Sequence, residues 1–252
     1  MWVLVHGFTG SPRSWDRVRA NRSMPAGDCH AVALHGHHSG WREQSSTSFE
    51  GEVQRIAEQL QQLPGPRYLC GYSLGARISL GLLLEYPELF EAAVLIGVHP
   101  GVSDPADRAA RRRDDAERAE MLRSEGLAAF VGAWEALPLF ATQQKLEASS
   151  LRLQRELRLG HEAEGLASSL ETLGLAQMPD YAPRLHELTM PVTLMAGALD
   201  QKFSGLARSM LDRLPSGRLE VVDDTGHNLP LEAPHSVAQA LKEAELRAAA
   251  AK

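Results

Sequence analysis

Three residue types that together can activate a hydroxyl group occur in the order Ser73, Asp200 and His227 along this chain of 252 residues. Ser73 stands in the motif Gly71-Tyr72-Ser73-Leu74-Gly75, which follows an apolar run and precedes a helical pattern. A serine on a sharp strand-to-helix turn needs small neighbours, and the two glycines supply them. An imidazole can take the proton of such a serine, and a carboxylate can hold the imidazole in the required tautomer. The three residues therefore predict an activated serine.

The acid and the base each follow a predicted strand. Asp200 comes directly after the run Val192-Thr-Leu-Met-Ala-Gly197-Ala-Leu, and His227 follows the last apolar run. Asp223 and Asp224 are rival acids, but they lie too near His227 in the sequence to be favoured. The chain order serine, acid, histidine is the order found in α/β-hydrolases.

Two backbone amides complete the predicted catalytic machinery. His6-Gly7-Phe8 follows the first predicted strand, at the place where this fold supplies one oxyanion-hole N–H group. We expect that donor to be the N–H of Phe8, and the second donor to be the N–H of Leu74, directly after the serine. His6 itself is predicted to be a structural histidine of the loop.

The elements that must position these residues alternate between strands and helices, as in βαβ units. Apolar runs alternate with helical patterns, and several runs are apolar throughout, as in strands buried on both faces of a parallel sheet. The predicted strands are residues 2–6, 30–34, 67–71, 92–98, 192–197 and 219–222, and the predicted helices are residues 49–63, 73–86, 206–214 and 233–250. The fold class is therefore α/β, with an α/β-hydrolase fold and a mostly parallel central sheet.

Residues 103–184 do not follow this alternation of strands and helices. They are rich in Arg, Glu, Leu and Ala at helical spacing and contain no convincing strand. We predict a helical cap inserted before the penultimate strand, with residues 1–102 and 185–252 forming the hydrolase core.

Beyond the fold, the chain resembles the family of 2-succinyl-6-hydroxy-2,4-cyclohexadiene-1-carboxylate synthases of menaquinone biosynthesis. The resemblance extends from His6-Gly7-Phe8 to Gly226-His227-Asn228. Its specific parts are Gly71-Tyr-Ser-Leu-Gly-Ala-Arg77, Asp107-Arg108-Ala-Ala-Arg111 followed by Asp115, Trp134-Glu135-Ala-Leu-Pro138-Leu-Phe140, Gly165-Leu-Ala-Ser-Ser-Leu170 and Asp200-Gln-Lys202-Phe203.

The resemblance implies a lyase reaction, a 2,5-elimination that expels pyruvate from 2-succinyl-5-enolpyruvyl-6-hydroxy-3-cyclohexene-1-carboxylate. Ser73, activated by His227, would then remove a proton from the substrate instead of being acylated. The resemblance also implies the substrate-binding residues, which are Tyr72, Arg77, Arg111, Trp134 and Lys202. Arg77 lies one helical turn beyond Ser73, and we expect Arg111 to approach from the cap and Lys202 from the loop after Asp200. An arginine can bind a carboxylate through two parallel hydrogen bonds.

One loop departs from the family pattern. Members of that family usually carry Asp-x-Pro-Gly-His-Gly after the second strand, whereas this chain reads Ala33-Leu34-His35-Gly36-His37-His38-Ser39. No carboxylate or thiolate adjoins the three histidines, so we do not predict a metal site there.

Two other functions remain open. The same three residues could serve a carboxylesterase, thioesterase or lactonase with Ser73 as acyl nucleophile, or the chain could be a non-catalytic, ligand-binding relative. The complete set of serine, acid and base argues against the last of these. No cofactor or metal is needed for either reaction.

Composition bounds the partners. The formal net charge is −6, which disfavours nucleic acid, and 44% of the residues are hydrophobic, as in a protein with a buried core. No apolar stretch is long enough to span a membrane and no signal peptide is recognisable, so we expect a cytoplasmic protein.

Cys29 and Cys70 do not form a disulfide framework, and Cys70 is predicted to be a buried thiol. The expected partner is a small carboxylate or ester, and the oligomeric state is left open.

Overall fold

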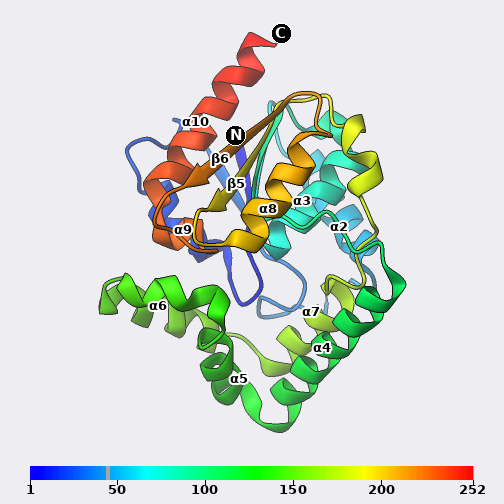
Figure 1. Cartoon of the computed structure of the whole chain (residues 1–252), viewed down its shortest axis with the longest axis vertical. Helices are drawn as coiled ribbons and strands as arrows, with labels where there is room; N and C mark the ends of the chain where they lie inside the picture. The colour runs from blue at the N-terminus through cyan, green and yellow to red at the C-terminus, as the bar shows by residue number, and fades with distance from the viewer. Residues whose placement is uncertain (44–45, 252) are drawn as a thin grey trace.

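The computed structural model describes residues 1–43 and 46–251. Within these residues six strands form one parallel sheet in the order β2-β1-β3-β4-β5-β6. Figure 1 shows the sheet between the helices that cover it. The strands are β1 (Trp2–Val5), β2 (Cys29–Val32), β3 (Tyr68–Tyr72), β4 (Ala92–Ile96), β5 (Val192–Gly197) and β6 (Gly217–Val222). The predicted fold class is confirmed.

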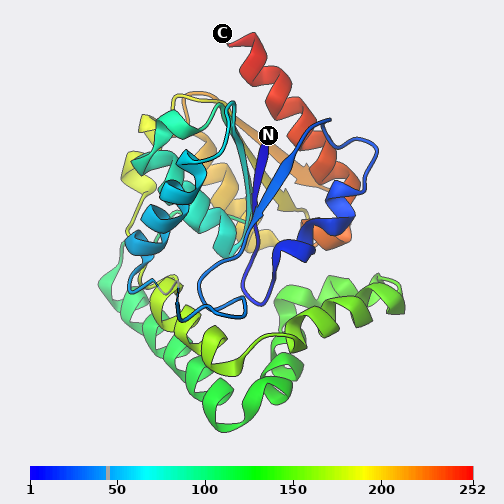
Figure 2. The same cartoon turned by 180° about the vertical axis from the view of Figure 1, so that it is seen from behind.

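Side chains that alternate along the strands fill two cores. Val3 and Val5 point to one face, which is covered by α2 (Phe49–Gln61), α3 (Leu74–Glu85) and α8 (Gln201–Leu211). Trp2 and Leu4 point to the other face, which is covered by α1 (Asp16–Arg19) and α10 (Pro234–Ala250). Figures 1 and 2 show these layers from the two sides. Cys70 lies in the second core and is buried, as predicted.

The chain between β4 and β5 forms a set of helices across one end of the molecule. These are α4 (Pro105–Ser124), α5 (Gly126–Glu135), the 3-10 turns η3 (Pro138–Lys145), α6 (Ala148–Leu159) and α7 (Ala163–Leu173). Figures 1 and 2 place them opposite the C-terminus, beside the end of the sheet where the strands finish. α4, α5 and α7 share a small core that includes Leu122, Phe130 and Leu166. We refer to α4–α7 with η3 as the cap.

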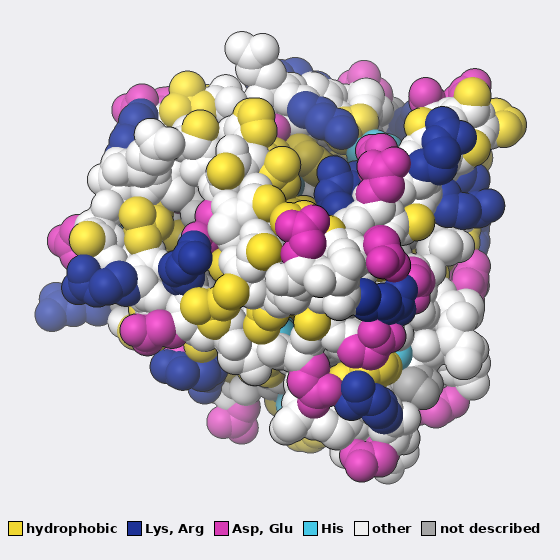
Figure 3. Space-filling model, turned by 90° about the horizontal axis from the view of Figure 1, so that it is seen from below, with side chains coloured by type: hydrophobic (Ala, Val, Ile, Leu, Met, Phe, Trp, Pro, Cys, Tyr) yellow, Lys and Arg dark blue, Asp and Glu magenta, His cyan; other side chains and the backbone are white. Residues whose placement is uncertain are grey.

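Charges of both signs are interspersed on the face of the molecule seen in Figure 3. Within the cap, Arg123 pairs with Glu164 and Glu171, and Glu135 binds both Arg155 and the buried Arg158. These pairs join α4 to α7 and α5 to α6. The pairs of Glu135 attach α6, which contributes no residue to the small cap core, to α5.

One predicted helix begins earlier than its apolar pattern indicated. α8 starts at Gln201, because the Asp200 carboxylate accepts a hydrogen bond from the N–H of Phe203 at 3.2 Å and caps the helix. Lys202, expected in a loop after Asp200, therefore lies in the first turn of α8. The expectation of a loop at this position was wrong.

Candidate active site

The candidate site lies where the sheet order reverses. The chain passes from β1 to β2 on one side and then returns to place β3 on the other side of β1. In an open parallel sheet, ligands bind beyond the carboxyl ends of the strands at such a point. Gly7 and Phe8 follow β1 there, and Ser73 follows β3.

Ser73 has a backbone conformation that is rare for a residue with a side chain, with φ 54° and ψ −110°. Its N–H donates to the carbonyl oxygen of Ile96 at 2.9 Å, which fixes the turn against β4. A Cβ atom at Gly71 would lie 2.5 Å from the carbonyl oxygen of Gly75, and one at Gly75 would lie 2.1 Å from that of Val5. The two glycines of the motif are therefore required by close backbone packing.

The structure brings the predicted base and acid to this serine. His227 Nε2 lies 3.0 Å from Ser73 Oγ, and His227 Nδ1 lies 2.7 Å from Asp200 Oδ2. A carboxylate can only accept, so the proton sits on Nδ1 and Nε2 is free to accept from the serine hydroxyl. His227 and Asp200 are buried, whereas the rival acids Asp223 and Asp224 are exposed.

In the part of the chain that the structure describes, neither of the two predicted oxyanion donors forms a hydrogen bond. Leu74 is the first residue of α3, so its N–H has no acceptor within the helix. None of the described residues accepts a hydrogen bond from the N–H of Phe8 either. Phe8 and Leu74 line the same cavity as Ser73. Both amides are therefore available to an oxygen bound beside the serine.

A cavity of about 300 Å³ lies between Ser73 and the cap. Its lining includes all five predicted substrate-binding residues: Tyr72, Arg77, Arg111, Trp134 and Lys202. Arg77 donates from Nη1 to the carbonyl oxygen of Leu173 at 2.9 Å. Burial and the neighbouring Arg111 lower the pKa of Arg77 to about 9, so it remains cationic at neutral pH. A bound anion would relieve the repulsion between these two cations.

His99 also lines this cavity, and the sequence reasoning missed it. Its Nδ1 accepts from the N–H of Gly101 at 3.2 Å, so the proton lies on Nε2, which has no acceptor among the described residues. Burial, followed by the positive charges of Lys202, Arg77 and Arg111, lowers the pKa of His99 to about 4. His99 therefore offers a neutral donor among three cations. Its place just after β4 was the one available signal.

A second cavity of about 300 Å³ adjoins the first, on the other side of Phe8, Tyr72 and Phe140. It lies between residues 6–17 and α6. Burial raises the pKa of Tyr72, whose ring packs against His227 with centroids 5.4 Å apart. Tyr72 is therefore a neutral wall between the two cavities.

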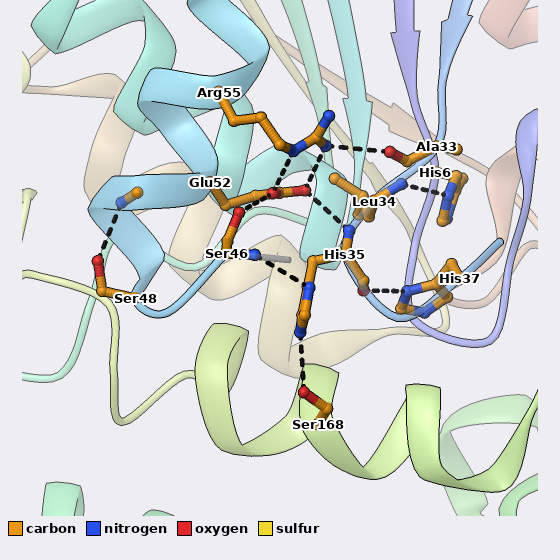
Figure 4. A network of polar contacts seen from close by, with 11 residues as sticks. His6, Ala33, Leu34, His35, His37, Ser46, Ser48, Glu52, Arg55 and Ser168 are labelled. Carbon is orange, nitrogen blue, oxygen red and sulfur yellow. Dashed lines mark hydrogen bonds and ion pairs between the residues drawn. The ribbon is translucent and has the colours of Figure 1, made fainter. Parts of the chain in front are cut away.

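The histidine-rich loop is held by a buried ion pair, shown in Figure 4. Glu52 accepts from the N–H of His35 at 2.9 Å and from Arg55 Nε at 2.8 Å, and Arg55 also donates to the carbonyl oxygen of Ala33. Burial acts to raise the pKa of Glu52, but the hydrogen bonds from Arg55, Ser46 and His35 hold it below its usual value. The pair stabilises a loop that lacks the aspartate and proline of the family pattern.

His35 also joins this loop to the cap. Its Nδ1 accepts from the N–H of Ser46 at 3.2 Å, so its Nε2–H donates to Ser168 Oγ of α7 at 2.8 Å. Both ring nitrogens of His35 are thus engaged in hydrogen bonds within the protein.

Within residues 1–43 and 46–251, no helix combines the length and apolar character needed to cross a membrane.

Comparison with known proteins gives matches both in sequence and in structure. Residues 2–240 match the model of a family described as "Alpha/beta hydrolase family". The chain is 32% identical over 244 residues to a 2-succinyl-6-hydroxy-2,4-cyclohexadiene-1-carboxylate synthase of Serratia proteamaculans, covering 96% of this chain and 91% of the relative. An Enterobacter protein of the same name is 31% identical, with 95% and 89% covered. The solved structure titled "Structure of MenH from S. aureus" is similar with a TM-score of 0.90 and 26% identity, covering 98% of this chain and 94% of that one.

Proposed function

This chain belongs to the alpha/beta hydrolase family, within the group named 2-succinyl-6-hydroxy-2,4-cyclohexadiene-1-carboxylate synthase, and we propose that it catalyses the reaction in that name. The reaction would eliminate pyruvate from 2-succinyl-5-enolpyruvyl-6-hydroxy-3-cyclohexene-1-carboxylate, a step of menaquinone biosynthesis. The observation that carries the proposal is the cavity beside Ser73, where Arg77, Arg111 and Lys202 converge. A substrate with several carboxylates needs such a set of cations.

The elimination can be written on the residues of this site. His227, held by Asp200, takes the hydroxyl proton of Ser73, and the serine oxygen removes the proton from ring carbon 2 of the substrate. The C2–H electron pair forms the C2=C3 bond, the C3=C4 pair moves to C4=C5, and the C5–O bond breaks. Enolpyruvate leaves and tautomerises to pyruvate, and the ring becomes the 2,4-diene. Ser73 then holds the proton from carbon 2, and His227 returns the proton that it took from Ser73 to solvent, which offsets the proton that the departing enolate takes up at its methylene carbon.

The oxyanion donors have a place in this reaction. Ring carbon 2 carries the succinyl ketone, so the charge released at carbon 2 spreads onto the ketone oxygen. The N–H groups of Phe8 and Leu74 would donate to that oxygen. Donors aimed at charge that develops in the transition state contribute about 3–4 kcal/mol each in comparable sites.

A serine ester hydrolase is the second candidate. The contacts of His227 with Ser73 and Asp200, at 3.0 and 2.7 Å, serve acyl transfer equally well. The difference lies in the rest of the cavity, because a neutral ester has no carboxylate to pair with three cations. The cationic lining therefore favours the synthase.

A side-by-side assay tests the proposal. Pyruvate release from the elimination substrate and hydrolysis of p-nitrophenyl acetate would be measured on the wild type and on Arg77→Met, Arg111→Met and Lys202→Met. Each charge-assisted hydrogen bond contributes about 1.5–3 kcal/mol, so each variant should lose roughly 10- to 150-fold in kcat/KM for pyruvate release. Ester hydrolysis should change only a few-fold.

Mass spectrometry of quenched turnover mixtures adds a second test. If Ser73 acts as a base, no acyl adduct accumulates on it with the elimination substrate, and Ser73→Ala should lose on the order of 10³-fold in turnover. An acyl-Ser73 adduct, or a wild type that hydrolyses the ester and releases no pyruvate, would establish the hydrolase instead.

A further inference from the structure

The segment that carries the proposed oxyanion donor Phe8 is strained at the next residue. Thr9 is buried and has φ 61°, in the left-handed region that β-branched residues seldom adopt. Such a conformation persists only where the surrounding contacts hold it in place. The turn is closed by the N–H of Gly10, which donates to the carbonyl oxygen of Gly7 at 3.0 Å, so contacts that hold the Thr9 backbone also hold the Gly7–Phe8 peptide.

Two histidines hold Thr9, one from the core and one from the cap. The N–H of Thr9 donates to His37 Nε2 at 3.1 Å, and His37 is fixed in turn by a bond from its Nδ1–H to the carbonyl oxygen of His35 at 2.9 Å. On the other side, His161 Nε2 lies 3.2 Å from the carbonyl oxygen of Thr9 and must donate, because a carbonyl only accepts. His161 lies between α6 and α7, 152 residues away in the sequence.

The same residues form a chain of ring contacts. The His161 ring meets His37 edge-on with centroids 5.4 Å apart, and His37 meets Phe8 in the same way at 5.5 Å. Phe8 also contacts Trp134 of α5 at 5.2 Å. The cap thus contacts this loop both through the Thr9 backbone and through the Phe8 ring.

From these contacts we propose that His161 is a positioning residue through which the docked cap sets the oxyanion hole. Its hydrogen bond to the Thr9 carbonyl oxygen holds the 9–10 peptide, whose Gly10 N–H donates to the carbonyl oxygen of Gly7 at 3.0 Å. The Gly7–Phe8 peptide held in this way carries the Phe8 N–H, which stays directed at the serine cavity. The proposal rests on the oxyanion role of Phe8 within the proposed function. It makes the cap part of the catalytic machinery, because the cap orders a donor on the core as well as covering the substrate.

The proposal predicts a specific kinetic signature. Loss of a whole oxyanion donor lowers kcat about 10²- to 10³-fold in comparable sites, and a displaced donor should lower it roughly 10-fold or more. The loss should fall on kcat with KM changed no more than about threefold, because a transition-state donor contributes little to ground-state binding. It should affect pyruvate release and ester hydrolysis alike, since both pass through a developing oxyanion.

The experiment compares His161→Leu, which has no donor, with His161→Gln, whose amide can still donate at a similar distance. His161→Asn is polar but too short to reach Thr9, and it replaces the leucine variant if that variant does not fold. His186→Leu, at an exposed histidine of the 3-10 turn η4 (Ala182–Glu187), is the matched control. Each variant is assayed for both reactions and for the affinity of phenylboronic acid, which forms a tetrahedral adduct with an activated serine.

We expect His161→Leu and His161→Asn to lose roughly 10-fold in kcat and in boronate affinity, and His161→Gln and His186→Leu to keep wild-type values. A folded leucine or asparagine variant with wild-type kcat would overturn the proposal. So would a variant whose whole loss lies in KM, since that loss would indicate substrate contact. If the wild type releases no pyruvate, the proposed function fails, while the ester and boronate series still decide the role of His161.

Discussion

Arg111 donates from Nε to both carboxylate oxygens of Asp115, at 3.0 and 2.9 Å, one turn further along α4. The Asp115 side chain is only 5% exposed, and Arg118 approaches it at 3.5 Å. Both bonds of Arg111 use the same nitrogen, and none of the described residues accepts from its two terminal nitrogens. Arg111 can therefore remain anchored to the cap helix while it presents two donors to the cavity.

This geometry predicts that Arg111→Lys is not conservative. A lysine has one ammonium group, which cannot pair with Asp115 and grip a carboxylate in the cavity with two parallel bonds. We expect a loss of roughly 10-fold in kcat/KM for pyruvate release, corresponding to about 1.4 kcal/mol. The neighbouring Arg112 is exposed, so Arg112→Lys is the control and should match the wild type. Equal activity of the two lysine variants would remove Arg111 from the substrate site.

A second prediction separates the acids near His227. In Asp200→Asn an amide N–H can face Nδ1 and favour the tautomer whose Nε2 carries the proton, which cannot accept from Ser73. Turnover should fall on the order of 10³- to 10⁴-fold, with the circular dichroism spectrum unchanged. Asp224→Asn, at an exposed position, should stay within about twofold of the wild type. A crippled Asp224→Asn beside an active Asp200→Asn would show that the acid is misassigned.

A third prediction concerns stability in acid. His6 is fully buried, and its Nε2 accepts from the N–H of Leu34 at 3.3 Å, so the folded state holds the ring neutral. Burial lowers the pKa of His6 to about 4 from 6.5. The part of the folding stability that depends on a neutral His6 is complete above about pH 6.5. It is lost as the pH falls towards 4, because the unfolded chain then binds the proton more readily than the folded chain.

Between about pH 7.5 and pH 5, His6 alone should lower the free energy of unfolding by about 2 kcal/mol. Urea denaturation at the two pH values measures this difference. His6→Gln cannot titrate and should reduce the difference by a similar amount. An unchanged pH dependence in His6→Gln would mean that His6 does not titrate differently in the folded and unfolded states.

The sheet and the positions of the candidate catalytic residues could be predicted from the sequence, because they depend on local pattern and on parallel strand direction. Ser73, Asp200 and His227 each follow an apolar run, and parallel strands bring their carboxyl ends to one edge. The contacts of His161 and His99 could not be predicted in this way. The bond of His161 to Thr9 depends on how the cap docks on the core, which helical periodicity does not specify. His99 follows β4, but its role depends on cations that arrive from α3, α4 and α8.

The last prediction assigns His99 to carboxylate recognition. A neutral Nε2–H among Arg77, Arg111 and Lys202 can donate to an anion without adding a fourth positive charge to the cavity. Because a hydrogen bond to a charged group contributes about 1.5–3 kcal/mol, His99→Leu should raise KM for pyruvate release roughly 10-fold or more. His99→Gln keeps a donor near the position of Nε2 and should stay within about threefold of the wild type. Hydrolysis of p-nitrophenyl acetate should be unaffected in both variants, because that ester carries no carboxylate. Burial and the three cations hold the pKa of His99 at about 4, so replacing it with glutamine should leave the pH profile between about pH 6 and 8 unchanged. Equal losses on both substrates in His99→Leu would instead identify His99 as a structural support of the loop after β4.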